Sequence, residues 1–492
     1  MDLDDDACYR AIATRDARFD GRLFIGVKTT GIYCRPVCPA RTPKRENVRF
    51  YSSAAGAQEA GFRPCLRCRP ETAPDTGIWR GSSNTVSRGL ALIEMGALDG
   101  GDIEALADRL GVGERQLRRL FRRHIGASPN SVAQTKRVLL AKQLIHESSL
   151  SMTEVALASG FGSVRRFNET FRELYGRPPS MLRRGIADSD SKGVIEILLR
   201  YRPPYDWPAI LSFLKARSIP GIESVTGETY ARTIDISGAQ GTVAIAPASG
   251  NALRAIIRFP KLAALPSIIA RLRRVFDLGA DLVTIGAHLS LDPTLAPLVA
   301  ARPGLRVPGA WDGFELAVRA VLGQQISVSA AIALAGEIVI AHGARLKQGA
   351  NAIGLTHVFP RPERLANAEL AGMPRQRAAS LKALATRVAG DPHLFGPRRS
   401  LEEAIERLCD ISGIGEWTAQ YIAMRELREP DAFPAADIGL LRAMANGVGR
   451  RMTPKELHER AEPWRPWRAY AAQHLWASDQ SRDLAVQSRA AE

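Results

Sequence analysis

Residues 33–38 read YCRPVC and residues 64–68 read PCLRC, which gathers four of the six cysteines of the chain into two close pairs. The pattern is C-x3-C, a gap of 26 residues, and then C-x2-C. Such pairs can form disulfides, hold a structural metal, or react. Two close pairs at this separation fit a tetrahedral four-thiolate site. We therefore predict that one Zn²⁺ is bound by Cys34, Cys38, Cys65 and Cys68.

The amino terminus and the net charge predict where the protein works and with what. The first residues, MDLDDDACYR, are acidic and hold no apolar segment, so they do not form a signal peptide. No apolar run is long enough to span a membrane. We expect a cytoplasmic protein without a membrane partner, and in that reducing compartment paired cysteines more often hold metal than form disulfides. The formal charge of +16 indicates a polyanionic partner such as nucleic acid, with a merely basic soluble protein as the alternative.

The length of 492 residues suggests three or four domains. Stretches rich in Pro, Gly, Ser and charged residues predict linkers at 69–84 and 183–193, and 300–313 reads as a loop between two units. We expect four domains, at 1–76, 85–186, 194–304 and 305–480.

The pattern of apolar residues differs between the segments that these linkers separate, and it predicts a multidomain α+β chain. Short β-like runs and a short helix in the first domain predict a small α/β fold around the zinc. Residues 85–184 and 312–480 show helical apolar periodicity. Residues 194–295 combine alternating runs with helices expected at 207–217 and 265–276.

The surroundings of the cysteines bear on whether the zinc is purely structural or also reactive. Four thiolates on Zn²⁺ leave a net charge of −2 and remain nucleophilic. Only Glu46 and Glu59 oppose a large set of cationic side chains, which can draw a DNA phosphate towards the sulfurs. That set is Arg35, Arg41, Lys44, Arg45, Arg49, Arg63, Arg67 and Arg69. Spacing alone favours the structural role.

The segments TTGIYCRPVCPART, RENVRFY and AGFRPCLRCRP resemble the N-terminal domain of the Ada methylation-response proteins, over most of residues 8–72. The resemblance implies that a zinc thiolate removes the methyl group from a methylphosphotriester in DNA. The acceptor is the first cysteine of the first pair, which corresponds to Cys34. Methylation turns a thiolate into a neutral thioether, so the cluster falls from −2 to −1 and its repulsion of DNA phosphates decreases.

Two helix pairs follow. IEALADRLGVGERQLRRLFRRHIG (103–126) and MTEVALASGFGSVRRFNETFRELYG (152–176) each contain a helix, a glycine turn and a basic second helix. Each pair reads as a helix-turn-helix whose second helix enters a major groove, and a solvated basic face is the alternative. The candidate DNA-binding residues are Arg115, Arg118, Arg119, Arg122 and Arg123 in the first copy, and Ser163, Arg165, Arg166 and Asn168 in the second.

Two copies joined by a long helix at about 129–147 resemble the AraC-type DNA-binding domain, with GFGSVRRFNETFRELYGRPPSMLRR as the most specific match. The resemblance implies an all-α double helix-turn-helix that reads an operator sequence, while phosphate contacts from its arginines supply affinity.

Near the carboxyl end, LCDISGIGEWTAQYIAMREL (408–427) predicts a helix, a turn at Gly413 and Gly415, and a second helix. The N–H groups that begin the second helix can hold a phosphate, although any helical hairpin can use such a turn. Asp437 follows 22 residues after Gly415 and directly precedes another helix. On local grounds it is an N-cap.

The segments LRYRPPYDWPAILSFLKARSI, AVRAVLGQQISV, GIGEWTAQYIA and PWRPWRAYAAQHLW resemble the AlkA family of alkylbase DNA glycosylases, over residues 197–476. The resemblance implies a TBP-like α+β domain followed by an all-α helix-hairpin-helix domain. It makes Asp437 the catalytic carboxylate and Trp417, Tyr421 and Trp476 the base pocket, although these aromatics can also be ordinary core. The best-known member inserts a leucine into the gap left by the flipped base. Gln325 stands at that position here, and its neighbour Ile326 is the alternative wedge.

The implied chemistry begins with flipping of the damaged nucleotide out of the duplex. Aromatic rings attract the cationic alkylated base, and the carboxylate stabilises the oxocarbenium-like sugar. Lyase relatives carry a lysine shortly after the hairpin glycines, whereas this chain has Trp417, so we expect a monofunctional hydrolase.

Together these features predict a bifunctional alkylation-response protein, in which methyl transfer to Cys34 switches on transcription and the glycosylase excises bases such as 3-methyladenine. The expected partners are alkylated DNA, operator DNA and RNA polymerase. Two alternatives remain: a transcription regulator with an inactive glycosylase segment, and a glycosylase with a DNA-tethering N-terminal half.

Overall fold

The computed structural model describes residues 4–73, 84–100, 102–183, 194–350, 354–396, 398, 400–445 and 452–490. Residues 74–83 and 184–193, which form most of the two predicted linkers, lie outside the described residues. The chain divides into two compact units: unit 1 is Met1–Tyr201 with Ala248–Ala270, and unit 2 is Arg202–Pro247 with Arg271–Glu492. Among the described helices, none has both the length and the apolar character needed to cross a bilayer.

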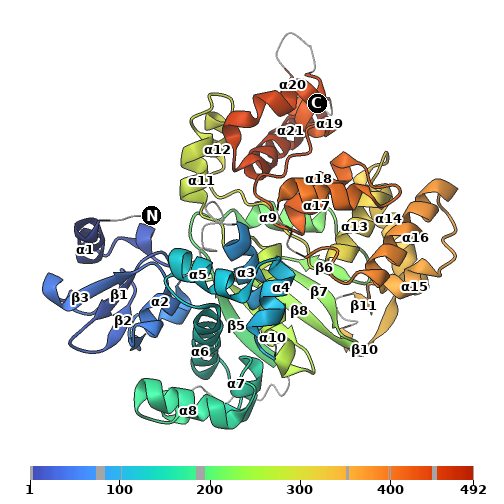
Figure 1. Cartoon of the computed structure of the whole chain (residues 1–492). Coiled ribbons are helices and arrows are strands. Elements are labelled where there is room, and N and C mark those ends of the chain that lie inside the picture. The colour runs from blue at the N-terminus through green and yellow to red at the C-terminus, as the bar shows by residue number, and fades with distance from the viewer. Residues whose placement is uncertain are drawn as a thin grey trace. The chain divides into compact units, whose positions relative to one another are not determined.

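Unit 1 begins with a small mixed sheet in the strand order β3-β1-β2-β4 (Figure 1). Strand β1 is antiparallel to β2 and β3, and β2 is parallel to β4. A Cβ at Gly26 would lie 2.8 Å from the Phe62 ring, so glycine lets this ring pack directly on β1. The elements are α1 (Asp5–Ala13), β1 (Phe24–Val27), β2 (Ile32–Cys34), β3 (Val48–Tyr51), α2 (Ala54–Glu59) and β4 (Arg63–Pro64), with short 3-10 turns at Ala17–Phe19, Arg45–Asn47 and Pro70–Thr72.

The next part of unit 1 is helical, as the apolar periodicity predicts. Its elements are α3 (Asn84–Glu94), α4 (Ile103–Leu110), α5 (Glu114–Ile125), α6 (Pro129–Glu147), α7 (Met152–Ala158), α8 (Val164–Tyr175) and a 3-10 turn at Pro179–Leu182. Gly111 ends α4 with a φ of 67°, and Gly160 has a φ of 83° in the turn before α8. Only glycine adopts this left-handed conformation at little cost, so both glycines fix the turn between the paired helices.

Unit 1 also contains β5 (Val194–Arg200) and β9 (Ala252–Arg258). The two strands are antiparallel, with Val194 opposite Arg258 and Arg200 opposite Ala252. Alternate residues of β5 are buried, which is the pattern of a strand with one face on the core.

Unit 2 combines antiparallel strands with many helices. Strand β7 pairs with both β6 and β8. The strands are β6 (Glu223–Thr226), β7 (Thr229–Ile236), β8 (Ala239–Ala248), β10 (Ala344–Ala350) and β11 (Leu355–Val358). Helix α10 (Leu265–Val275) begins in unit 1 and enters unit 2 at Arg271. The other helices are α9 (Trp207–Lys215), α11 (Leu282–Leu289), α12 (Ala296–Ala301), α13 (Gly313–Leu322), α14 (Val328–His342), α15 (Pro362–Ala366), α16 (Arg375–Gly390), α17 (Leu401–Cys409), α18 (Glu416–Arg425), α19 (Ile438–Ala443), α20 (Pro454–Arg460) and α21 (Arg468–Ala490).

The helices expected at 207–217 and 265–276 are therefore confirmed as α9 and α10. The helical expectation for 312–480 misses the β10–β11 hairpin, which is antiparallel. Thr356 and Val358 are β-branched and favour strands, but four residues of β11 are too few to show a clear period in the sequence.

The core of unit 2 positions the hairpin of helices α17 and α18. Helix α13 is buried along its whole length except at Arg319, and it packs in one apolar cluster with α14, α16 and α18. A second cluster joins α19 and α21 to Phe433 and Trp464. Because α18 contributes to both clusters, the loop before it and the loop before α19 are held by packed helices on each side.

Candidate functional sites

The four paired cysteines meet in space. Their Sγ atoms all lie within 4.8 Å of one another, at the end of β2, in the following turn and in the loop after β4. Four clustered thiols are the donor set of a tetrahedral zinc site, so these residues fit the predicted metal. Cys65 and Cys68 are buried, whereas Cys34 and Cys38 are half-buried. The outlying Cys8 is buried in the core of the small domain.

Backbone and side-chain donors surround this cluster. The Arg67 N–H donates to Cys65 Sγ at 3.3 Å, and the Arg35 N–H donates to Cys68 Sγ at 3.4 Å. The Arg35 guanidinium donates to the Cys68 carbonyl at 3.1 Å and forms an ion pair with Asp20. Asp20 is a component of the site that the sequence did not reveal, because nothing in its local pattern places it beside a cysteine loop.

Of the eight cationic side chains near the cysteines, Arg63 is half-buried beside the Tyr175 ring, and the other seven divide into two groups. Three of them are engaged in ion pairs: Arg35 with Asp20, Arg45 with Asp5 and Arg69 with Glu71 and Glu147. Four others are exposed on the surface, namely Arg41, Lys44, Arg49 and Arg67. The basic surface that can meet a phosphate is therefore smaller than the sequence suggests.

The basic residues of the two helix pairs lie on the second helix of each pair. On α5, Arg115 and Arg119 are exposed, and Arg118 forms an ion pair with Glu114 at 2.6 Å. Leu117, Phe121 and Ile125 on the opposite face are buried, so the arginine face points outward.

On α8, Arg165 and Arg166 are exposed, and Arg165 pairs with Glu169 at 2.8 Å. Ser163 is the N-cap of this helix, where its hydroxyl accepts the Arg166 N–H at 3.2 Å.

Asp437 lies at the start of α19, as the N-cap that local sequence predicts. Its carboxylate caps the helix by accepting the Leu440 N–H at 3.1 Å. It also accepts the Trp417 indole N–H at 2.9 Å and the Trp476 indole N–H at 2.8 Å, one on each oxygen. A simple cap needs only the first bond, so the two indoles mark this carboxylate as part of a built site.

The aromatic residues predicted for a base pocket are brought together around Asp437. The rings of Trp417 and Tyr421 lie 5.5 Å apart at an interplanar angle of 9°. With Trp476 and Asp437, they line a cavity of about 520 Å³ within unit 2. The Arg425 guanidinium lies over the rings of Tyr421, at 4.9 Å, and Trp476, at 5.5 Å.

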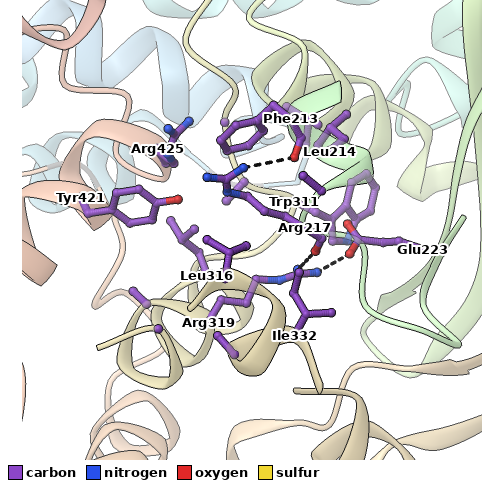
Figure 2. Close-up of a pocket in the computed structure, with 18 of the residues that line it drawn as sticks. Phe213, Leu214, Arg217, Glu223, Trp311, Leu316, Arg319, Ile332, Tyr421 and Arg425 are labelled. Atoms are coloured by element: carbon purple, nitrogen blue, oxygen red, sulfur yellow. Dashed lines mark hydrogen bonds and ion pairs between the residues drawn. The ribbon is translucent and has the colours of Figure 1, made fainter. Parts of the chain in front are cut away.

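Sequence reasoning missed the opposite wall of this cavity, which Figure 2 shows. The Arg217 guanidinium lies over the Phe213 ring at 4.0 Å, and Trp311 adds a second aromatic surface. The Arg319 guanidinium donates to the Arg217 carbonyl at 2.7 Å and to Glu223 at 2.5 Å. The i, i+4 spacing of Phe213 and Arg217 on the predicted helix was the one available signal.

The guanidinium groups of Arg425 and Arg217 change the pKa of Tyr421. Burial raises the pKa of this phenol, but Arg425 and Arg217 outweigh burial and the net pKa is lowered. The cavity thus carries a carboxylate beside two indoles and a phenol that faces two guanidinium groups.

The two hairpin glycines have different reasons to be glycine. Gly413 has a φ of 90°, and a Cβ there would lie 2.0 Å from Ser380 Oγ. Gly415, the N-cap of α18, has no atom within 4 Å of a Cβ position. The fold needs glycine at the first position, and the second leaves open space before the helix.

The two candidate wedge residues are also distinguished. Gln325 is exposed and has a φ of 60°, a left-handed conformation that is costly for a residue other than glycine. Ile326 is half-buried and lines the cavity.

Comparisons with known proteins match separate parts of the chain and, in one case, nearly its whole length. Family models match the chain at residues 7–71 (metal binding domain of Ada), 106–185 (helix-turn-helix domain) and 196–312 (AlkA N-terminal domain). A Mycobacterium tuberculosis (strain CDC 1551 / Oshkosh) protein is named "Probable bifunctional transcriptional activator/DNA repair enzyme AlkA". It is 39% identical over 485 residues, which cover 97% of this chain and 97% of that protein. The chain belongs to this bifunctional AlkA family.

Other relatives of this bifunctional AlkA-family chain match a part of its length. The Escherichia coli (strain K12) protein named DNA-3-methyladenine glycosylase 2 is 34% identical over 290 residues, 57% of this chain and 96% of that protein. A solved 3-methyladenine DNA glycosylase from Archaeoglobus fulgidus matches with a TM-score of 0.51 at 22% identity, over 58% of this chain and 98% of that one. The predicted fusion of Ada-like and AlkA-like parts is confirmed, and zinc is the metal of the cysteine cluster.

Proposed function

We propose that this protein couples a methyl sensor to a repair enzyme, as the names of its relatives suggest. In this proposal, Cys34 takes a methyl group from a DNA methylphosphotriester, the helix pairs read an operator, and the cavity beside Asp437 releases alkylated bases from DNA. The observation that carries the enzymatic part is the Asp437 carboxylate, held by two indole N–H groups on the wall of an aromatic cavity.

The proposed glycosylase step uses residues of unit 2 alone. A flipped base enters the cavity, where the Trp417 and Tyr421 rings attract an alkylated, cationic base. The Asp437 carboxylate lies at the edge of this stack and stabilises the positive charge that develops on the sugar. The exposed turn at Gly413 and Gly415 supports phosphate binding, because the first N–H groups of α18 have no intrahelical acceptor. Water then completes hydrolysis.

The proposed methyl transfer uses the more accessible of the two cysteine pairs. Cys34 Sγ forms a bond to the methyl carbon, the carbon–oxygen bond breaks, and its electron pair returns to the phosphate as a phosphodiester. Bound zinc supplies deprotonated thiolates for this chemistry. The half-buried position of Cys34 supports its role, since Cys65 and Cys68 are buried.

The helix pairs complete the proposal as a transcription activator that contacts operator DNA and RNA polymerase. We also assign domain boundaries at 1–76, 85–186, 194–304 and 305–480. The third domain is TBP-like and the fourth is the helix-hairpin-helix domain, which includes the β10–β11 hairpin as an addition.

The glycosylase proposal is tested with the full chain and duplex DNA carrying N3-methyladenine or N7-methylguanine. We expect release of the free base without strand cleavage, because a monofunctional hydrolase leaves the abasic site intact. Release of no base would leave only the regulatory function. Strand cleavage, together with a covalent protein–DNA imine trapped by borohydride reduction, would contradict the hydrolase.

The methyl acceptor is tested with a duplex that contains a single methylphosphotriester. Mass spectrometry should place the added methyl group on the peptide that contains Cys34. Cys34→Ser should lose the transfer while retaining partial zinc binding, and Cys38→Ser is the matched variant at the other half-buried ligand. A methyl group on any other cysteine of the wild-type protein would overturn the assignment.

A further inference from the structure

A buried ion pair joins the cysteine cluster to the helix between the two helix-turn-helix motifs. Lys142 lies in the middle of α6, and its side chain is 0% exposed, while the Glu71 side chain is 1% exposed. Lys142 Nζ donates to Glu71 at 2.6 Å and to the Cys65 carbonyl at 2.8 Å. A lysine of the DNA-reading part therefore holds the backbone of a zinc ligand.

The same cysteine loop is held by α6 at a second place. Arg69, directly after Cys68, donates from Nε to Glu71 at 3.0 Å and from Nη2 to Glu147 at 3.0 Å. Glu147 is the last residue of α6. Lys142 and Glu147 of α6 thus both bind the segment Cys65–Glu71, through ion pairs that share Glu71 and Arg69. Because the pair at its centre is buried, water cannot replace either partner without cost.

Both reading helices also end against the small domain. The Ser53 hydroxyl, just before α2, donates to the Ile125 carbonyl at 2.7 Å, where α5 ends. The Arg63 guanidinium lies 5.8 Å from the centre of the ring of Tyr175, the last residue of α8. Figure 1 shows α2 beside α6 in unit 1. The C-terminal ends of α5 and α8 are therefore both in contact with the small domain that carries the cysteines.

We propose that Lys142 is a positioning residue for the cysteine site, and that the Lys142–Glu71 pair couples the state of this site to the reading helices. The proposal rests on the proposed methyl-acceptor function and adds a route for its output. Loss of one thiolate charge changes the pull on the Cys65–Cys68 loop, and α6 receives that change through Lys142 and Arg69. Coupling of this kind is reciprocal, so bound operator DNA must also alter the cysteine site.

The test compares Lys142→Met, Glu71→Met and the double variant in the full chain. Glu71→Met leaves the buried Lys142 ammonium without a carboxylate, and Lys142→Met leaves the buried Glu71 paired with Arg69 but without its shorter ion pair. Both single variants should therefore lower the unfolding temperature. The double variant removes both charges and should recover most of that loss. The Cys65 carbonyl still lacks its donor in the double variant, so the coupling should remain lost. If the pair had only a structural role, the double variant would instead recover both the unfolding temperature and the coupling.

The coupling is measured as the ratio of operator affinities of methylated and unmethylated protein. The probe is a duplex selected from a randomised library by the wild-type chain. We expect Lys142→Met and the double variant to reduce this ratio by about fivefold or more, which is the lower end of typical coupling between sites. Lys136→Met, which removes another lysine of α6 from its half-buried pair with Glu94 of α3, should leave the ratio unchanged. A wild-type ratio in the double variant would overturn the proposal.

A second readout does not depend on methyl transfer. In protein loaded with Co²⁺, the same duplex should change the visible absorption of the thiolate site in the wild type and not in the double variant. Equal changes in both would overturn the coupling. If wild-type Cys34 takes no methyl group, the acceptor function fails by itself, and this spectrum still decides whether the pair couples the two sites.

Discussion

Asp437 combines an N-cap with the catalytic role that we propose for it. Its oxygens accept one backbone N–H and two indole N–H groups. Asparagine caps helices about as well as aspartate, so a cap alone would tolerate Asp437→Asn. In this site the amide would point an N–H group at one of the indole donors, and one hydrogen bond would be lost.

We therefore expect Asp437→Asn to destabilise the protein by about 1–3 kcal/mol, the loss of a hydrogen bond to a charged group, while the fold is kept. Base release should fall by about 10²–10³, by analogy with other preorganised groups that stabilise charge. Single-turnover release of N3-methyladenine, with thermal unfolding in parallel, measures both effects. Asp102→Asn is the matched control, since Asp102 caps α4 through the Ala105 N–H. Wild-type excision by folded Asp437→Asn protein would return the residue to the cap role.

His474 on α21 predicts a pH dependence of stability. Burial, with added repulsion from Arg302, lowers its pKa from 6.5 to about 4. The folded state therefore resists a proton that the unfolded state accepts below pH 6.5. The stabilising contribution is present above that pH and is lost as the pH falls towards 4.

The difference in unfolding free energy between wild type and His474→Gln should accordingly decrease from pH 7.5 to pH 4.5. The decrease should reach up to about 3 kcal/mol, since each pH unit between the two pKa values contributes about 1.4 kcal/mol. Denaturant unfolding followed by circular dichroism at several pH values measures it. A difference that stays constant with pH would contradict the buried, neutral histidine.

At the residue scale, the sequence predicted what spacing and motif encode. The zinc ligands follow from two close pairs, and their clustering is confirmed. Asp20 and Arg217 were missed because their roles arise from tertiary contacts. Asp20 meets Arg35 across 15 residues, and Arg217 faces Tyr421 from just after the end of α9, about 200 residues away in sequence. No local pattern records such a meeting.

The turn before α18 shows that two similar glycines can serve different partners. Gly413→Ala would place a methyl group against Ser380 in a left-handed backbone, which costs about 1–3 kcal/mol from conformation alone and more from the clash. Gly415→Ala meets open space and should leave stability nearly unchanged.

If the turn approaches a DNA phosphate, Gly415→Ala should nevertheless weaken DNA binding and raise the KM for base release, with little effect on unfolding. Gly413→Ala should instead lower the unfolding temperature more than it weakens DNA binding. Binding to an abasic-site duplex and thermal unfolding of both variants separate the two. Unchanged DNA binding by Gly415→Ala would show that this turn does not contact the backbone.

The outward face of α5 is expected to contact DNA. Arg115→Ala, Arg118→Ala and Arg119→Ala should each weaken operator binding. A base-reading arginine should cost about 1–3 kcal/mol and relax specificity, whereas a phosphate contact should reduce the salt slope by about one. Affinity measured at several salt concentrations distinguishes them. If Arg10→Ala, at an exposed position of α1, weakened operator binding equally, the effect would be one of net charge alone.

Elements with strong periodicity and caps were predictable. Helix α6 has the expected bounds, Pro129–Glu147, because Ser128 and Pro129 mark its start. The β10–β11 hairpin was not predictable, since β11 has only four residues and its pairing is a tertiary event. Short strands gain most of their stability from partners rather than from their own sequence.

At the scale of the whole molecule, the two chemical sites lie in different compact units. The four cysteines belong to unit 1, and Asp437 with its aromatic cavity belongs to unit 2. Removal of zinc by a chelator should therefore abolish methyl transfer and lower the unfolding temperature of unit 1, because bound metal contributes directly to folding. Base release should be retained.

The measurement is base release and Cys34 methylation in one preparation, before and after chelation, with zinc added back as the control. Parallel loss of both activities would contradict independent sites. Recovery of methyl transfer on addition of zinc would exclude irreversible damage.

The indoles that donate to Asp437 also allow occupancy of the cavity to be followed by tryptophan fluorescence. All of the seven tryptophans except Trp79 lie in unit 2, and Trp417 and Trp476 border the carboxylate. A purine stacked on an excited indole quenches its emission, so occupancy of the cavity becomes a fall in intrinsic fluorescence. With Asp437→Asn, which should hold a damaged base without releasing it, this emission would report the flipping step alone, on unlabelled DNA and in real time.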